Sequence, residues 1–226
     1  MSIDRNIKAD LLDRVSINQS FDFMNVYKGL PLVYKARLQS VGEKSAKFKV
    51  DPPSSICLGW ENCTTILEDA NTNAINANVV NFDIKNGLVE LTDFKYANRG
   101  IGYRMMVRVE PKDIIPVNII YKNQTIPGDL ADISLTGFGV RTQTLGNLQL
   151  RETVQLEVTL MEQRITPIGT LINITEEDDG LRLAIRFGVE MTIPVATARY
   201  ITHRRAEIHR EIHEAYEKAI ESAKKS

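Results

Sequence analysis

Strict alternation of apolar and polar residues marks the second half of the chain. Every second residue from Val154 to Leu160 is apolar, and the same period recurs from Leu181 to Phe187, as in half-buried strands. Ile165–Ile174 and Leu181–Val189 flank the acidic segment Glu176–Gly180 and are predicted to pair as a hairpin. Further apolar segments lie at Val117–Tyr121 and Ala131–Thr142. Five or six antiparallel strands of this length predict a small barrel.

The first half of the chain is also mostly β in pattern, from about Phe21 to Phe94. Val79–Lys85 and Leu88–Leu91 flank Asn86-Gly87, which is the strongest signal for a two-residue hairpin turn. We therefore predict a separate N-terminal β domain, so that the fold class is mainly β with two small antiparallel barrels.

From Pro194 onward the apolar period becomes helical, with Pro near the start and neither Gly nor Pro after it. The expected apolar stripe consists of Ile201, Ile208, Ile212, Ala215 and Ala219, and Arg205 interrupts it. A C-terminal α-helix of about 30 residues is longer than one small barrel can cover. Its distal half either frays or packs against another chain, and we favour a partner surface, including self-association into a homo-oligomer.

The composition changes between the two β regions. Tyr96–Arg104 contains two glycines and few core candidates, which is typical of an interdomain linker. We expect an N-terminal β domain over residues 1–98, a linker over 99–112, and a C-terminal barrel with its helix over 113–226.

Charge and cysteine content narrow the classes of function. Of 226 residues 43% are hydrophobic and 25% are charged, as in a globular protein, and the net charge is −1. No global positive field is therefore present to attract DNA, RNA or an anionic membrane. Cys57 and Cys63 lack zinc-ligand spacing and are expected to be reduced. With no apolar run approaching 18 residues and no signal-peptide pattern, we expect a cytoplasmic protein without membrane insertion.

Two short motifs carry the candidate chemistry. Arg104 and Arg108 stand four residues apart in an RxxxR pattern within the predicted linker. Arginine offers five donors in a planar fork that fits phosphate oxygens, and the same fork pairs with O6 and N7 of guanine. Two such residues in a glycine-bearing segment are suited to a compact anionic nucleotide.

The second motif is DxSxxG, formed by Asp132, Ser134 and Gly137. A strand here places Asp132, Ser134 and Thr136 on one face and turns Ile133 and Leu135 into a core. A carboxylate and a hydroxyl side by side are suited to the N1–H and N2–H donors of guanine. Gly137, like the nearby Gly139, allows a sharp turn or a close approach of the ligand.

RxxxR followed by DxSxxG, in this order and strand context, resembles the ligand-binding pattern of PilZ domains, bacterial receptors for the second messenger cyclic di-GMP. Arg108–Pro111 and Leu183–Phe187 also resemble the framework of that family. The resemblance implies a six-stranded barrel in which Arg104 and Arg108 wrap the ligand and Asp132, Ser134 and Gly137 form the floor. Candidate additional contacts are Tyr103, Arg99, Gly139 and Arg141. Tyr103 stands where many members have a third arginine, which leaves open whether one ligand or an intercalated pair binds.

The two-domain layout resembles the flagellar brake group of cyclic di-GMP effectors. That resemblance implies a receptor in which the ligand reorients the two domains and so regulates a protein partner, in flagellar motility, biofilm or exopolysaccharide output, or secretion. One alternative is a PilZ-fold adaptor that binds only proteins, although all five key motif residues are present. Another is a barrel that binds single-stranded nucleic acid, which needs a basic groove with exposed aromatics.

No enzyme, metal site or cofactor is expected. His209 and His213 have the i,i+4 spacing of metal ligands, but Arg210 replaces the glutamate of the metalloprotease pattern HExxH. The chain also lacks a phosphate-cradling glycine loop, a nucleophile elbow and a carboxylate dyad. We interpret the histidines as part of a solvated helix face.

Overall fold

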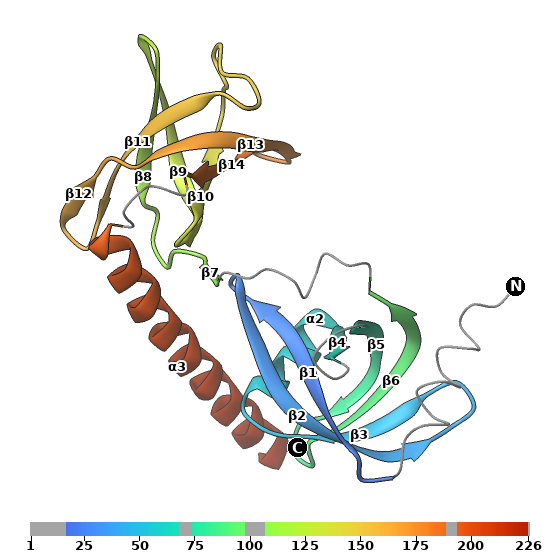
Figure 1. Ribbon diagram of the computed structural model, residues 1–226. Helices are drawn as coiled ribbons and strands as arrows, with labels where there is room; N and C mark the ends of the chain where they lie inside the picture. The colour runs from blue at the N-terminus through green and yellow to red at the C-terminus, as the bar shows by residue number, and fades with distance from the viewer. Residues whose placement is uncertain (1–16, 68–73, 98–106, 189–193, 226) are drawn as a thin grey trace, which may run out of the picture. The chain divides into compact units, whose positions relative to one another are not determined.

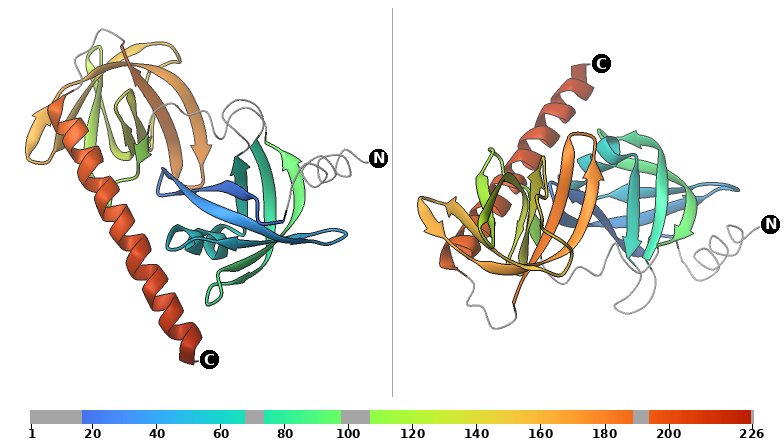
Figure 2. Two further views of the ribbon diagram at one scale, coloured as in Figure 1. Left: turned by 60° about the horizontal axis from the view of Figure 1, so that its bottom comes forward. Right: turned by 90° about the horizontal axis from the view of Figure 1, so that it is seen from above.

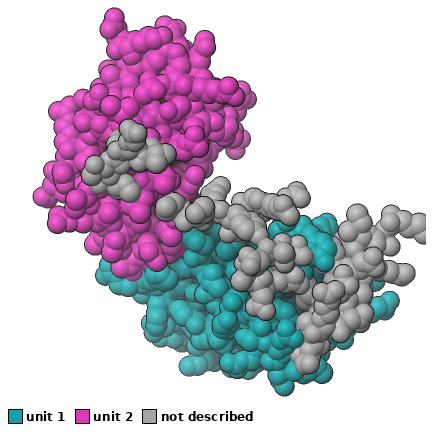
Figure 3. Space-filling model, viewed as in Figure 1, with its two compact units in different colours: residues 1–27, 31–104, 208–226 teal, residues 28–30, 105–207 magenta. Residues whose placement is uncertain are grey.

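The computed structural model describes residues 17–67, 74–97, 107–188 and 194–225. The chain divides into two compact units, which are coloured separately in Figure 3: residues 1–27, 31–104 and 208–226 form unit 1, and residues 28–30 and 105–207 form unit 2. Arg99, Tyr103 and Arg104 lie outside the described residues. The domain limits that we predict at residues 98 and 113 therefore remain predictions.

The first barrel is a closed ring of six antiparallel strands in the order β1-β2-β3-β6-β5-β4 (Figure 1). Its strands are β1 (Ser20–Tyr27), β2 (Leu30–Val41), β3 (Ala46–Val50), β4 (Cys63–Leu67), β5 (Ala74–Asp83) and β6 (Leu88–Tyr96). A 3₁₀ turn η1 (Ser54–Ile56) and the short helix α2 (Cys57–Glu61) connect β3 to β4. The predicted N-terminal β domain is thus confirmed as a barrel.

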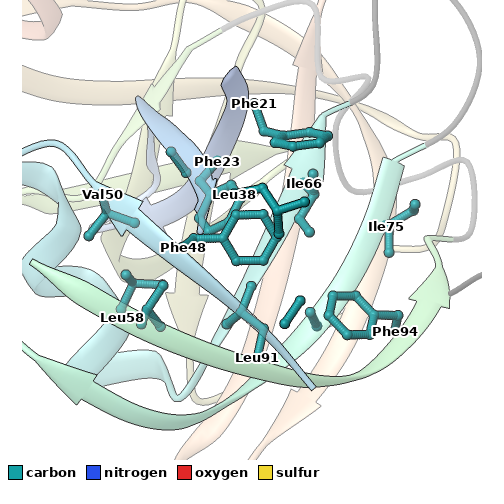
Figure 4. Packing of buried hydrophobic residues seen from close by; sticks show 14 of the residues in the cluster. Phe21, Phe23, Leu38, Phe48, Val50, Leu58, Ile66, Ile75, Leu91 and Phe94 are labelled. Atoms are coloured by element: carbon teal, nitrogen blue, oxygen red, sulfur yellow. The ribbon is translucent and has the colours of Figure 1, made fainter. Parts of the chain in front are cut away.

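Aromatic side chains fill the centre of this first barrel. Along β2 buried and exposed residues alternate over ten positions, so that one face of the strand points inward. Phe23 and Phe48 are fully buried, and their ring centroids lie 5.0 Å apart in an edge-to-face arrangement (Figure 4). Phe21 meets the same Phe48 ring at 5.8 Å. Such pairs add about 0.5–1.5 kcal/mol beyond the area that they bury.

The predicted two-residue hairpin at Asn86-Gly87 is wrong in its length. β5 ends at Asp83 and β6 begins at Leu88, so the turn has four residues. The carboxylate of Asp83 accepts hydrogen bonds from the backbone N–H of Asn86 at 3.0 Å and from its side-chain amide at 2.7 Å. Gly87 supplies the positive φ of 56° at the end of this turn. Capping by Asp83 therefore favours the longer turn.

The second barrel is also a closed ring of six strands, in the order β10-β14-β13-β11-β8-β9 with β9 paired back to β10. Figure 2 gives two further views of this barrel, whose strands are coloured from green through yellow to orange. Its strands are β8 (Pro116–Tyr121), β9 (Gln124–Ser134), β10 (Gly137–Thr142), β11 (Thr153–Leu160), β13 (Ile168–Glu177) and β14 (Gly180–Phe187). Two short strands extend the sheet: β7 (Arg108–Val109) pairs with β9, and β12 (Gln163–Ile165) pairs with β11. The six-stranded barrel is confirmed.

The core of the second barrel follows the predicted alternation. Val154, Leu156, Val158 and Leu160 of β11 are all buried. On β14 the predicted inward residues Leu183, Ile185 and Phe187 are buried. Leu181 is only half-buried because it lies next to the hairpin turn. That turn is Asp178-Asp179, so the predicted β13–β14 hairpin is confirmed with a shorter connection.

Helix α3 (Val195–Lys225) follows Pro194, as predicted. Ile201, Ile208 and Ile212 are buried within the single chain, whereas Ala215 and Ala219 are half-buried. The helix is continuous to Lys225, so the distal half is not frayed; its association with another chain stays a prediction. Within the described parts, no helix combines the length and the apolar character that crossing a membrane requires.

Arginine on α3 is arranged differently from the prediction. Arg205, expected to interrupt the apolar stripe, is exposed, and its neighbour Arg204 is buried with 1% exposure. Nε of Arg204 donates to the carbonyl oxygen of Glu110 at 2.9 Å, and Nη1 lies 3.1 Å from a carboxylate oxygen of Glu207. A buried guanidinium needs such partners because an unpaired charge in the interior is costly. Arg204 thus ties α3 to the backbone that follows β7.

Candidate functional site

β7 brings part of the first motif onto the strand that carries the second. In the antiparallel β7–β9 pairing, Arg108 stands opposite Ser134 and Val109 stands opposite Ile133. Val109 and Ile133 are both fully buried, which directs this pair into the barrel. Because side chains alternate across a strand, Arg108 and Ser134 lie on the outer face. The second arginine of RxxxR is therefore adjacent to DxSxxG, while Arg104 lies outside the described residues.

The DxSxxG motif spans the β9–β10 hairpin. β9 ends at Ser134, Leu135 and Thr136 form a two-residue turn, and β10 begins at Gly137. The Ser134 hydroxyl donates to the carbonyl oxygen of Gly137 at 2.8 Å and accepts from the backbone N–H of Thr136 at 3.3 Å. This serine stabilises the turn, as short hydroxyl side chains commonly do.

The predicted division between outer and inner faces is correct for β9 but wrong for Leu135. Asp132 and Ser134 share the face opposite to Ile133, which points into the core. Leu135 is only half-buried because the strand has already ended and the residue lies in the turn.

The glycines of this region are required for close packing. A Cβ at Gly137 would collide with the carbonyl oxygen of Ile185 on β14, and a Cβ at Gly139 would collide with the carboxylate of Asp132. Neither glycine needs a positive φ. We expected a sharp turn or a close approach of the ligand; the close approach in this structure is between strands at Gly137 and with the Asp132 side chain at Gly139.

Asp132 is the central ionic group of the site. Its side chain is only 5% exposed, and two arginines share its carboxylate. Nη2 of Arg182 on β14 donates to Oδ2, and Nη1 of Arg108 lies 3.6 Å from Oδ1. Two cations around one carboxylate compensate for its burial, which would otherwise be unfavourable. The predicted acceptor for guanine is thus already engaged by two guanidinium groups.

The ion pairs continue beyond Asp132 along the outer face of the barrel. Nη1 of Arg182 lies 3.5 Å from Oε1 of Glu177, and Nε of Arg141 donates to Oε2 of the same glutamate at 2.9 Å. We call Arg108, Asp132, Arg182, Glu177 and Arg141 the arginine–carboxylate network. Arg141, a candidate additional contact, therefore joins the site indirectly, through Glu177 and Arg182.

Protonation within the network follows from these contacts. The hydrogen bond from Arg141, together with the positive charges of Arg141 and Arg182, holds the pKa of Glu177 below its usual value. Burial acts to lower the pKa of Arg182, but the hydrogen bond and the charge of Asp132, together with Glu177, outweigh it and raise the pKa. Glu177 and Arg182 are therefore both ionised at neutral pH.

Arg182 was not singled out in the sequence. The signal that could have found it is the outward face of β14, where Arg182 and Arg186 alternate with the buried Leu183 and Ile185. This face lies beside β10, since Arg182 pairs with Arg141 in register and Arg186 pairs with Gly137.

A shallow depression of about 60 Å³ lies over the motif, and we call it the site depression. It is lined by Arg108, Asp132, Ser134, Thr136, Gly137, Phe138, Ile172, Ala184, Ile185 and Arg186. Pockets that enclose a small molecule usually measure about 300–1,000 Å³, so this one is a floor on which a ligand can rest. Two arginines and one aspartate give it a net positive charge, which favours an anion.

In the part of the chain that the structure describes, no histidine or cysteine lines the site depression. Among the described residues no three His, Cys, Asp or Glu side chains are grouped as metal ligands. Nδ1 of His213 faces Glu217 at 3.3 Å on the surface of α3. Cys57 and Cys63 are free thiols, and burial raises the pKa of Cys57 to about 12, which disfavours the reactive thiolate.

Comparison with known families finds a match over the second barrel. Residues 104–202 match the family model described as PilZ domain, so this part of the chain is similar to PilZ domains. Both motifs lie within the matched residues, since the match begins at Arg104 and ends in the first turns of α3. No curated protein sequence matches the chain.

The chain is also similar to several solved structures, each at low sequence identity. YcgR of Escherichia coli in complex with c-di-GMP is 16% identical, with a TM-score of 0.42, and the match covers 95% of this chain and 93% of that one. MotI/DgrA, the inhibitor of motility of Bacillus subtilis, is 12% identical, with a TM-score of 0.43 and coverage of 88% and 98%. The PilZ domain of YcgR with c-di-GMP is 21% identical, with a TM-score of 0.40 and coverage of 48% and 96%.

Proposed function

We propose that this protein is a cyclic di-GMP receptor without enzymatic activity, and that the PilZ domain holds the ligand at the site depression. The observation that carries the proposal is the grouping of Arg108, Asp132, Ser134 and Gly137 around one depression on the outer face of the barrel. Four residues of two motifs that are separated by more than twenty positions in the sequence meet there. Cyclic di-GMP is the ligand that the family pattern of these motifs implies.

The chemistry of the depression fits an anionic purine nucleotide. The side chain of Arg108 is 35% exposed, so its guanidinium can reach a ligand while it remains close to Asp132. Charge-assisted hydrogen bonds to arginine contribute about 1.5–3 kcal/mol each. Because the depression is shallow, a bound dinucleotide needs a second group above it, and we assign that role to Arg104.

The remaining contacts are assigned by position in the sequence. Tyr103 and Arg99 precede Arg104 in the same glycine-bearing segment, where an aromatic ring can stack on guanine and a further arginine can reach phosphate. Tyr103 also bears on stoichiometry, since it occupies the position of a third arginine. Titration by calorimetry measures directly whether one or two ligands bind to each chain.

The output of the receptor is a change in how its two barrels are arranged, which regulates a protein partner. RxxxR lies in the segment of sequence between the barrels, so a ligand that binds this segment changes the conformations open to it. A ligand shifts a conformational equilibrium only by its difference in affinity between the two states. A role in motility, biofilm formation or exopolysaccharide output in the cytoplasm follows from the resemblance to the flagellar brake group.

Calorimetric titration of the full chain with cyclic di-GMP, GTP and a short single-stranded oligonucleotide tests the proposal. We expect saturable binding of cyclic di-GMP, and binding of GTP that is weaker by at least tenfold. Absence of cyclic di-GMP binding would overturn the proposal and favour a PilZ-fold adaptor that recognises only proteins. A preference for the oligonucleotide would favour a nucleic-acid-binding barrel.

The conformational part of the proposal needs a separate measurement. Small-angle scattering of the full chain with and without cyclic di-GMP reports the distribution of distances between the barrels. We expect the two scattering profiles to differ at saturating ligand. If cyclic di-GMP binds but the two profiles are identical, the protein is a receptor whose ligand does not rearrange the barrels, and the conformational part of the proposal fails.

A further inference from the structure

We propose that Arg182 is a positioning residue for the ligand site: it holds one oxygen of Asp132 and thereby leaves Arg108 available to the ligand. The inference rests on the proposed function for its consequence in binding, but its structural part can be tested without any nucleotide. Arg182 belongs to neither motif and does not line the site depression. Its effect on the ligand therefore passes through Asp132.

The carboxylate of Asp132 is divided between two arginines. Oδ2 accepts the hydrogen bond from Nη2 of Arg182, whereas Oδ1 is 3.6 Å from Nη1 of Arg108. The first contact is a direct hydrogen bond, and the second is longer than a hydrogen bond between charged groups, which is about 2.7–2.9 Å. Arg108 is thus attracted to Asp132 without being locked to it.

Arg182 is well suited to hold Asp132 because it is fixed on both sides. It lies within β14, and its Nη1 atom is 3.5 Å from Oε1 of Glu177, which in turn accepts a hydrogen bond from Arg141 at 2.9 Å. The raised pKa of Arg182 keeps its charge across the whole physiological range. A guanidinium anchored by Glu177 presents its remaining donors to Asp132 in a defined direction.

The backbone of β10 restricts the carboxylate from the other side. Gly139 stands opposite Asp132 in the β9–β10 pairing, and the space where a Cβ would project is filled by the Asp132 carboxylate. The side chain of Asp132 is 5% exposed, so water cannot replace a lost arginine partner fully. In the part of the chain that the structure describes, Arg108 and Arg182 are the cations paired with the Asp132 carboxylate.

Loss of Arg182 therefore changes the state of Arg108. A buried carboxylate left with one cation forms the strongest pair that it can, because an uncompensated charge is costly in the interior. The fork of Arg108 can pair with both oxygens of Asp132, which engages the donors that a phosphate or a guanine would use. Arg182→Met keeps most of the side-chain length and removes the charge, so it isolates this effect.

Chemical modification of Arg108 in the absence of nucleotide tests the structural part. Phenylglyoxal reacts with accessible arginine, and peptide mass spectrometry follows each site separately. We expect Arg108 to be modified several times more slowly in Arg182→Met than in the unchanged chain. An unchanged or faster rate would overturn the proposal, because simple loosening of the structure exposes Arg108. Arg182→Lys, which keeps the charge and a single directed donor, should give an intermediate rate.

Arg164→Met is the matched control. Arg164 on β12 is another barrel arginine in an ion pair, 2.8 Å from Glu157, but it does not belong to the arginine–carboxylate network. We expect the same substitution there to leave the modification rate of Arg108 unchanged. Circular dichroism of all variants, including Arg182→Lys, confirms that the comparison is made between folded proteins.

A double-mutant cycle with cyclic di-GMP tests the consequence for binding. Arg182→Met should weaken the affinity about tenfold in the unchanged background, and less than twofold in the Asp132→Asn background, where the carboxylate is absent. Equal losses in both backgrounds would overturn the route through Asp132. If the unchanged chain binds no cyclic di-GMP, the proposed function fails, and the phenylglyoxal rates still decide whether Arg182 controls Arg108.

Discussion

Arg108 and Ser134 stand directly opposite each other in the β7–β9 pairing, so one register position joins the two sequence motifs. The backbone pairing fixes the position of the Arg108 Cα atom on the sheet. The carboxylate of Asp132, two positions from Ser134, attracts the Arg108 guanidinium. The geometry of the site therefore depends on the pairing of the strands as well as on the contacts between side chains.

Removal of either motif arginine should weaken binding of cyclic di-GMP. We expect Arg108→Ala and Arg104→Ala each to lower the affinity by tenfold or more, since each loses charge-assisted contacts of about 1.5–3 kcal/mol. Calorimetry of the two variants measures the loss. Thermal unfolding should change little for Arg108→Ala, because Asp132 keeps Arg182 as its partner. Unchanged affinity in both variants would contradict the site assignment.

Gly139→Ala should damage the site by displacing Asp132. The added methyl group would overlap the Asp132 carboxylate, and forcing atoms into a packed position costs about 1–3 kcal/mol. We expect a lower melting temperature together with weaker nucleotide binding. Gly188→Ala is the control, because among the described residues, its chain neighbours aside, no atom lies within 4 Å of the position of its Cβ. Similar behaviour of the two variants would show that Asp132 moves aside without loss.

Acid should weaken the network through Glu177. Its pKa is below the usual 4.5 in the folded chain because of Arg141 and then Arg182, so the unfolded chain takes up the proton first. The stabilisation is therefore fully present above about pH 4.5 and is lost as pH falls through the lower folded value. Denaturant unfolding at several pH values should show a smaller loss of stability below pH 4.5 in Glu177→Gln. A steeper loss in that variant would contradict the assignment.

Two adjacent arginines on α3 should respond very differently to the same substitution. Arg204→Met removes a buried donor from the Glu110 carbonyl and should lower the free energy of unfolding by about 1–3 kcal/mol. Arg205→Met changes an exposed residue and should stay within about 0.5 kcal/mol. Chemical denaturation of both variants gives the comparison. Equal effects would mean that burial of Arg204 contributes nothing measurable.

The fold could be predicted from the sequence wherever apolar residues recur with one uninterrupted period. β11 and β14 alternate strictly, and both are strands with the expected inward residues. Asn86-Gly87 predicts a shorter turn than the structure has, because Asp83, three residues before Asn86, caps the turn with its side chain. The burial of Arg204 beside the exposed Arg205 could not be predicted, because successive residues on a helix point about 100° apart and only packing decides which of two neighbours is buried.

The site could be predicted only as far as its motifs reach. Arg108, Asp132, Ser134 and Gly137 lie together, as the resemblance of the motifs implies, because a hairpin and one register position are enough to bring them together; their contacts with a ligand stay a prediction. Arg182 could not be found in this way, because it lies 50 residues from its partner Asp132. Contacts across a closed barrel depend on the register of strands that are distant in sequence, and no local pattern encodes that register.

The shortness of β7 has a consequence for how affinity can be tuned. Two residues in the sheet are enough to fix the backbone of Arg108 before any ligand arrives, so only its side-chain torsions are left to order. Fixing the backbone of a free residue costs about 1–2 kcal/mol, and the β7 pairing removes this cost for Arg108. The affinity of the site can therefore be tuned through the β7–β9 pairing as well as through the side chains that contact a ligand.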